Sequence, residues 1–392
     1  MRDELARKSR IGFALTTYLA LAGVGGLGVL GKVNLLHAVS ADVRPLILVL
    51  LSVWISSALL WRVALRFRHI LAPVVLCGLI GCPLLVFPHI LKMHATGRGS
   101  DQPDCIIIVS DKLAHREWPY DSSQVWSHNP LSCGPGWVAL QAPLVQAFSY
   151  QWTLVVVFVI TLIVLARGSG WDHTAALLAL LSLAPGLWIA ACDGTDFLPF
   201  GFCVAAIYAV TARSERRSLT FTFVLSLITQ FRVTTLLLPA VLSKRIGKVP
   251  AIAASAIAIT TEAAFLSYAP ARFIHDGPLH ILSKSIGKDF SQGSPIYLIF
   301  SFVFFAIVFT MIAFRVARRF TSGTLLLCYM LCIFAVPALI NLVATWRHYG
   351  LTVSSLGLWE GGNWMVGCLP LSALLLVREW SLQAHSRPFL KR

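Results

Sequence analysis

Long apolar runs separated by short polar segments make up most of the chain. An α-helix needs roughly 20 apolar residues to cross a hydrocarbon core of about 30 Å. The pattern predicts an all-α, polytopic transmembrane bundle that forms a single integral membrane domain over residues 1–392, without a soluble domain. The ten expected crossings are 11–31, 45–61, 70–91, 152–166, 174–191, 197–212, 251–268, 296–314, 324–342 and 363–377.

Composition agrees with this pattern. Hydrophobic residues make up 57% of the chain, charged residues only 12%, and the mean hydropathy is +0.76. These values exclude an ordinary soluble domain. The net charge of +15 would suggest nucleic acid in a soluble protein, but here most basic residues lie in short clusters between spans, so no nucleic acid partner is expected.

The basic clusters predict the topology. Cytoplasmic loops of membrane proteins are enriched in Lys and Arg, which places both termini in the cytoplasm and the protein in the cytoplasmic (inner) membrane. The first apolar run is interpreted as an uncleaved helix, because no convincing cleavage site follows it. On the outer side we expect a large loop at 93–151, an acidic loop at 192–197 and a further loop at 269–295.

The apolar run 219–242 has basic residues at both ends, at 213–217 and 244–248. One crossing cannot have both ends inside, so this run is predicted to be a re-entrant or broken helix hairpin, interrupted near 229–233. Arg232 would then point into a polar cavity, since an isolated arginine in the bilayer costs roughly 2.5–3.5 kcal/mol on insertion scales. Its expected role is to bind a lipid phosphate. A structural pair with an intramembrane acid such as Glu262 is the alternative.

The first outer loop has three parts. Residues 105–114 are apolar on one side and too short to span, which predicts an interfacial helix on the membrane surface. Trp118-Pro119-Tyr120 is expected to end it. The stretch 127–137 is rich in turn formers and carries polar side chains suited to a hydroxyl-rich ligand, although an ordinary structured turn would show the same composition. Cys105 and Cys133 could pair if this side is oxidising, or stay free.

Two of the outer carboxylates are unusually placed. Asp104 and Asp196 each precede an apolar segment, where partial desolvation makes a carboxylate more basic and suits it to general-base work. The other outer acids, among them Asp111 and Asp193, are typical of solvated loops.

Three short motifs resemble a known family. They are the Asp104 helix with Trp-Pro-Tyr and the turn 129–137, the acidic stretch 193–198, and the segment 230–234. Together they resemble the outer loops of polytopic GT-C-type glycosyltransferases, and most closely the polyprenyl-phosphate-sugar-dependent mannosyl- and arabinosyltransferase-like branch. The resemblance implies transfer of a sugar from a polyprenyl-phosphate donor to an envelope glycan, lipid or protein acceptor on the outer face of the membrane.

The resemblance also implies roles for individual residues. Asp104 would be the catalytic base, with Asp111 as its nearby competitor, and Arg232 would stabilise the leaving phosphate. Asp193 and Asp196 would orient the acceptor or hold a divalent metal, and no other cofactor is expected. The remaining candidates for substrate binding are Tyr120, His128 and Asn129. The competing hypotheses are a transporter or flippase of a lipid-linked or anionic solute, and a non-catalytic membrane subunit of a larger assembly.

Overall fold

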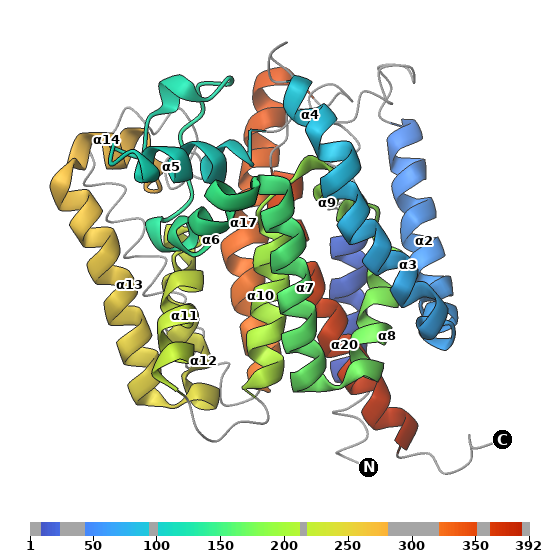
Figure 1. The fold of residues 1–392 in the computed structure, drawn as a ribbon. Helices are drawn as coiled ribbons and strands as arrows, with labels where there is room; N and C mark the ends of the chain where they lie inside the picture. Colours follow the sequence, from blue (N-terminus) through green and yellow to red (C-terminus); the bar gives the residue numbers. More distant parts are fainter. Residues whose placement is uncertain are drawn as a thin grey trace.

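The computed structural model describes residues 9–23, 44–93, 101–211, 218–280, 321–350 and 361–385. Every regular element in these ranges is helical, and none of them contains a strand. The all-α prediction is therefore confirmed for the part of the chain that is described. Figure 1 shows most of the helices running side by side, with α5 lying across one end of the bundle.

Residues 9–23 form the first helix. Next come α2 (Arg44–Arg66), α3 (Arg68–Gly81), the π-helical turn η2 (Cys82–Val86) and α4 (Phe87–Met93). The first outer loop contributes α5 (Asp104–Ala114), η4 (Ser122–Gln124) and α6 (Pro135–Phe148). The central helices are α7 (Tyr150–Ser169), α8 (Trp171–Leu181), α9 (Pro185–Asp193) and α10 (Phe197–Val210). The chain continues through α11 (Leu219–Thr229), η5 (Val233–Thr235), α12 (Leu238–Ile246), α13 (Lys248–Tyr268) and α14 (Pro270–His275). The last elements are α17 (Ser322–Tyr349), α19 (Gly361–Val366) and α20 (Leu369–His385).

Fewer helices could cross a membrane than the sequence predicts. In the described ranges five are long and apolar enough, or six if the bent pair α8 and α9 counts as one span, so the expected ten crossings are not supported. The expected span 174–191 is not straight, because α8 and α9 meet at an angle of 91°. The expected span 197–212 is the 14-residue helix α10, which is short for a crossing. The expected span 296–314 lies outside the described residues.

α10 belongs to the core of the bundle. All its residues from Phe197 to Ala209 are buried, so it presents no apolar face to the outside. Phe197 and Phe200 meet Phe231 at ring-centroid distances of 4.9 and 4.0 Å. An apolar run enclosed in this way reads like a membrane span in the sequence, because hydropathy does not distinguish lipid from protein as surroundings.

One end of the bundle brings basic segments together. Arg68 at the start of α3 pairs with Asp172 of α8 at 2.9 Å. Arg245 of α12 lies 4.0 Å from the Tyr208 ring centroid, and Arg378 of α20 donates a hydrogen bond to the Tyr208 hydroxyl at 3.0 Å. These segments were all predicted to lie on one side of the membrane, and their contacts agree with that grouping.

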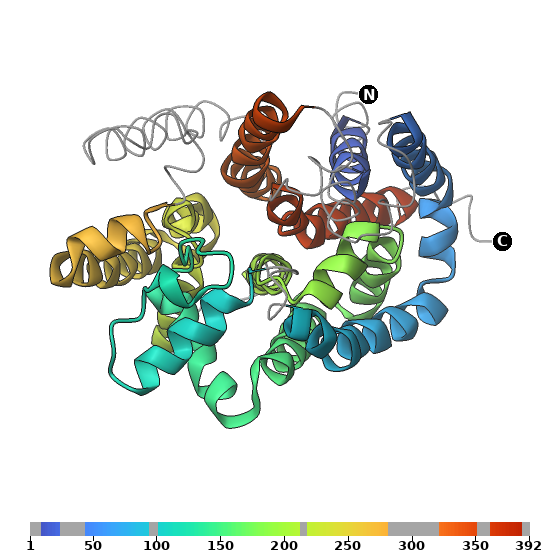
Figure 2. The same cartoon turned by 90° about the horizontal axis from the view of Figure 1, so that it is seen from above.

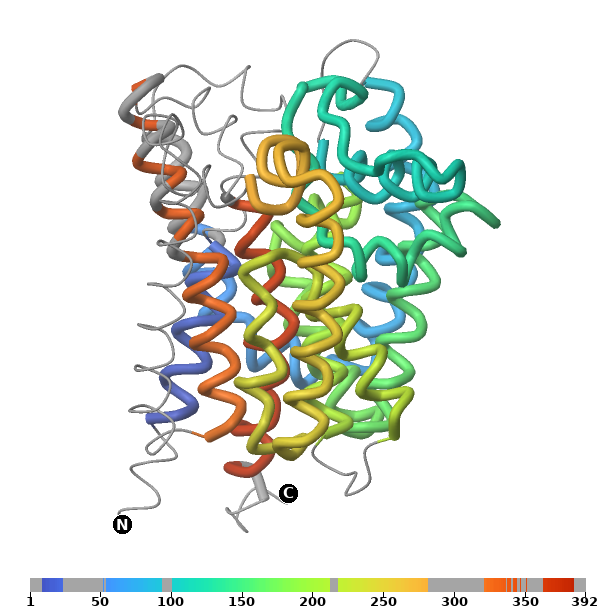
Figure 3. Tube along the Cα trace, turned by 90° about the vertical axis from the view of Figure 1, so that its left-hand side faces the viewer, coloured from blue at the N-terminus to red at the C-terminus, as the bar shows by residue number. Residues whose placement is uncertain are grey.

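The opposite end is formed by the first outer loop and the start of the loop at 269–295. Asp276, next to α14, accepts a hydrogen bond from Ser122 at 2.7 Å, and its carbonyl accepts one from the Leu131 amide at 2.8 Å. Figure 3 shows α14 and the α5 region together above the long helices. In Figure 2, α13 and α2 lie at opposite ends of the bundle, with α5 and α6 along one side. Residues 281–295 of this loop lie outside the described residues.

The first outer loop differs in detail from its prediction. The expected helix 105–114 is confirmed as α5. It ends at Ala114, before it reaches Trp118-Pro119-Tyr120, and Arg116 just beyond it has a φ of 59°. The expected turn 127–137 is irregular only to residue 134. α6 begins at Pro135, because the fixed φ and missing N–H of proline suit the first turn of a helix.

Candidate functional site

The predicted broken hairpin is present. α11 and α12 are separated by residues 230–237, which hold only the short turn η5. Non-helical backbone at membrane depth must find its hydrogen bonds inside the protein. Here the Thr235 hydroxyl accepts from the Arg232 amide at 3.0 Å and donates to the Thr229 carbonyl at 2.7 Å. Tyr329 of α17 donates to the Thr234 carbonyl at 2.7 Å. The break between α11 and α12 is therefore held by hydrogen bonds within the protein and is a regular part of the fold.

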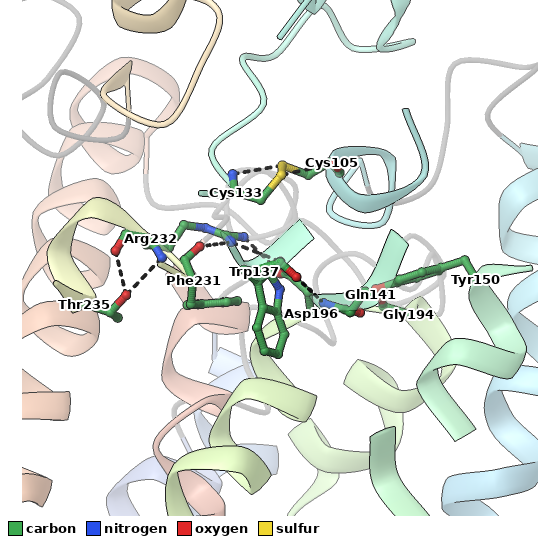
Figure 4. Close-up of polar contacts among 10 residues, drawn as sticks. All are labelled: Cys105, Cys133, Trp137, Gln141, Tyr150, Gly194, Asp196, Phe231, Arg232 and Thr235. Atoms are coloured by element: carbon green, nitrogen blue, oxygen red, sulfur yellow. Dashed lines mark hydrogen bonds and ion pairs between the residues drawn. A yellow bond between two sulfur atoms is a disulfide. The ribbon is translucent and has the colours of Figure 1, made fainter. Parts of the chain in front are cut away.

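Arg232 lies in this break and pairs with Asp196. Its two terminal nitrogens donate to the two Asp196 carboxylate oxygens at 2.9 and 3.0 Å, and both side chains are buried, with exposures of 1% and 0%. The guanidinium also lies 4.1 Å from the Phe231 ring centroid and 4.8 Å from that of Phe197. Figure 4 shows the guanidinium directed at Asp196. A structural pair with an acid, the alternative to a phosphate-binding role, is thus present, but its acid is Asp196 and not Glu262.

The first outer loop is fastened onto the break. The Gly136 amide donates to the Gln230 side-chain oxygen at 3.0 Å, and the Gly134 amide donates to the Phe231 carbonyl at 3.3 Å. A Cβ on Gly134 would collide with the backbone carbonyl of Gln230, which is why glycine is required at this close approach. Cys105 and Cys133 form a disulfide, so α5 is tied to the same turn.

Four charged side chains converge at this end of the bundle. Asp104, Asp193, Asp196 and Arg232 all lie within electrostatic range of the Tyr150 hydroxyl. Asp104 and Asp193 are 6% and 9% exposed. Tyr150 donates to the Gly194 carbonyl at 2.7 Å, which holds the turn between α9 and α10 in place (Figure 4). Acids from two separate loops and one buried arginine therefore lie near the same tyrosine.

A small cavity lies between the first outer loop and Arg232. Its volume is about 30 Å³, which is room for about two water molecules. Arg232 lines this cavity, and its Nε has no hydrogen-bond partner within the described residues, which leaves that N–H available as a donor. The polar and aromatic side chains around the cavity include Asp101, Gln102, Ser132, Arg232, His280 and Trp364.

Other predicted binding residues lie away from the acids. Asp111 is on the exposed side of α5, where its side chain is 64% exposed and lies 3.5 Å from His115. His128 is exposed and has a φ of 53°. Asn129 donates to Asp101, so it borders the cavity through that carboxylate.

Tyr120 has a structural position. It is fully buried and donates to the Cys133 carbonyl at 3.0 Å. Burial raises the pKa of Tyr120 well above its ordinary value, and the nearby Glu262 charge adds to this rise. The phenol therefore stays neutral and holds the turn that carries the disulfide.

Glu262, the example named for the acid partner of Arg232, is a buried acid that does not pair with it. It lies on the inner face of α13 with 7% exposure, and a Cβ on Gly134 would stand 2.7 Å from one of its oxygens. In the part of the chain that the structure describes, neither of its oxygens has a hydrogen-bond partner.

Sequence reasoning missed Tyr150 and Trp364. A tyrosine at the start of an apolar run is typical of an interfacial anchor, and that interpretation hid its position among the acids. Trp364 lies in an apolar segment, where nothing in the sequence marks it as cavity lining. Across the described ranges no group of three or more His, Cys, Asp and Glu side chains could hold a metal ion, so a divalent metal finds no ready set of ligands there.

Comparisons with known proteins gave no match. The sequence matches no family model, and no curated protein or solved structure is significantly similar. The likeness to GT-C-type enzymes remains a prediction from three short motifs. In the structure those motifs contact one another, through Gly134 and Phe231 and through Asp196 and Arg232.

Proposed function

We propose that this chain is a membrane glycosyltransferase of the GT-C type, which moves a sugar from a polyprenyl-phosphate donor to an envelope glycan, lipid or protein acceptor on the outer face of the cytoplasmic membrane. The observation that carries the proposal is the convergence of Asp104, Asp193, Asp196 and Arg232 around Tyr150. Loops that only connect helices would not need to place acidic residues from two loops close to the break between α11 and α12. The disulfide supports an oxidising outer side for this end.

The proposed reaction is a single displacement. An acceptor hydroxyl attacks the anomeric carbon, the bond from that carbon to the phosphate oxygen breaks, and polyprenyl phosphate leaves with the bonding electrons. Asp104 takes the hydroxyl proton, since it is the nearly buried acid at the start of α5. Asp193 lies in the same cluster and is suited to orient the acceptor through hydrogen bonds to its hydroxyls.

The structure changes the role proposed for Arg232 and Asp196. Both terminal nitrogens of Arg232 donate to Asp196, so we place the leaving phosphate beside the Nε–H, which has no hydrogen-bond partner among the described residues. Asp196 is then a positioning residue, which fixes the guanidinium at the cavity. His280 lines the same cavity.

Release of polyprenyl phosphate tests the proposal without knowledge of the acceptor. Membranes that contain the protein are mixed with a panel of polyprenyl-phosphate sugars, and free polyprenyl phosphate is measured. We expect release with at least one sugar, above the level of membranes that lack the protein. No release from any donor in the panel, with cell extract supplied as acceptor, would contradict the proposal.

A transporter or flippase is the second candidate, and the discontinuous hairpin α11–α12 favours it, because broken helices often build binding sites at the bilayer midplane. Vesicles separate the two functions. A transporter moves the intact lipid-linked sugar between leaflets and leaves its phosphate bond whole, whereas the enzyme breaks that bond.

A further inference from the structure

A second cavity lies in the other half of the bundle. It has a volume of about 430 Å³ and runs between α3, α7 and α8, which Figure 1 shows side by side. Most of its lining is aliphatic, with Leu76, Ile80, Leu162 and Leu178 among the side chains. This cavity is separate from the four charged residues near Tyr150. The cavity ends at Ile80 of α3, whereas the same stretch of chain reaches Gly194 and Tyr150 only farther on, at Phe87.

The length of this groove matches one leaflet of a bilayer. Along α3 it extends from His69 to Ile80, and at 1.5 Å per residue this is about 16 Å. Half of a hydrocarbon core of about 30 Å has nearly the same thickness. An acyl chain that begins at His69 would therefore reach about the middle of the membrane at Ile80.

The mouth of the groove carries positive charge and an interfacial aromatic ring. Trp171 lies there with 71% exposure, as is typical of side chains at the headgroup level. Three arginines stand close in sequence to residues of the mouth: Arg66 and Arg68 precede His69, and Arg167 precedes Trp171 and Asp172. Three arginines and the single acid Asp172, which pairs with Arg68, give these four residues a net positive charge that complements an anionic headgroup.

We propose that this groove binds one acyl chain of an anionic phospholipid, with its phosphate at the Arg66 and Arg167 end. The occupant lies in the leaflet at the basic end of the bundle, and the site is separate from the proposed transfer site. It would hold α3 against α7 and α8 by filling the space between them.

Photolabelling of the full-length protein in nanodiscs tests this site. The probe is phosphatidylglycerol with a diazirine in its acyl chain, present at low mole fraction in phosphatidylcholine, and labelled residues are mapped by mass spectrometry. We expect labels on α3, α7 and α8. Ala175→Phe places a ring in the groove and should reduce this labelling to the level of the lipid-facing residues of α13. Ala256→Phe, at an exposed position of α13, is the matched control and should leave the labelling unchanged.

The headgroup is tested separately. Arg66→Gln combined with Arg167→Gln should lower the preference for phosphatidylglycerol over phosphatidylcholine by about fivefold for each arginine removed. Unchanged labelling in Ala175→Phe, with a thermal unfolding temperature like that of the wild type, would overturn the site. Equal labelling by the two phospholipids in the wild type, or stronger labelling by a polyprenyl-phosphate probe, would overturn the anionic phospholipid as its occupant.

Discussion

Asp104→Asn is expected to lower the release of polyprenyl phosphate by about 10²- to 10⁴-fold, the usual contribution of a general base. Asparagine keeps the shape of aspartate, and the N-cap of α5 is Pro103, so α5 should still form. What the variant loses is the ability to accept the acceptor's proton. The measurement is the initial rate of release with the best sugar of the panel, together with the unfolding temperature of the purified variant.

Two carboxylates on the same loop serve as comparisons. Glu117→Gln is the matched control, since Glu117 is exposed and its partner is Lys112 at 2.7 Å, and its rate should equal that of the wild type. Asp111→Asn tests the competing base on the exposed side of α5, and we expect little change. A folded Asp104→Asn variant with the wild-type rate would remove Asp104 from the mechanism, and a large loss in Asp111→Asn alone would assign the base to Asp111.

Breaking the buried ion pair should be the most damaging change for stability. Asp196→Asn and Arg232→Gln should each lower the free energy of unfolding by about 3–5 kcal/mol, because either change leaves the other charge buried without its partner. Both residues are almost completely buried and joined by two hydrogen bonds. The double variant should cost less than the sum of the two single ones, since it leaves no lone charge. Equilibrium unfolding in mixed detergent micelles measures all three.

Glu262→Gln provides the matched comparison for a buried acid. Glu262 is about as buried as Asp104, but within the described part of the chain its carboxylate has no hydrogen-bond partner. Replacing it by the neutral isostere should therefore leave stability unchanged or raise it, because the change breaks no hydrogen bond or ion pair seen in the described residues. If Glu262→Gln proved as costly as Asp196→Asn, burial alone rather than the ion pair would explain the losses.

Much of the fold could be predicted from the sequence. The helical class and helix α5 followed from hydropathy and from the length of each apolar run. The broken hairpin followed from charge, since basic clusters at both ends of one run cannot belong to a single crossing. The sequence did not decide whether Cys105 and Cys133 pair. A separation of 28 residues along the chain says nothing about the distance between the two thiols in space.

The site was harder to predict than the fold. Asp104, Asp196 and Arg232 were found because charged residues beside apolar segments are unusual. Arg232 pairs with Asp196 and not with Glu262. This choice depends on how α10 packs against the hairpin, and local sequence patterns do not predict such tertiary packing. The count of crossings failed for a related reason, since α10 is apolar but enclosed by protein.

A structure of the protein with a non-hydrolysable polyprenyl-phosphate sugar analogue tests the central claim most directly. The proposed function predicts the phosphate at the cavity beside the Arg232 Nε, with the anomeric carbon on the side of Asp104 and the prenyl chain leaving toward the lipid. A phosphate found away from Arg232, or a ligand in a path that opens alternately to the two sides of the membrane, would contradict it.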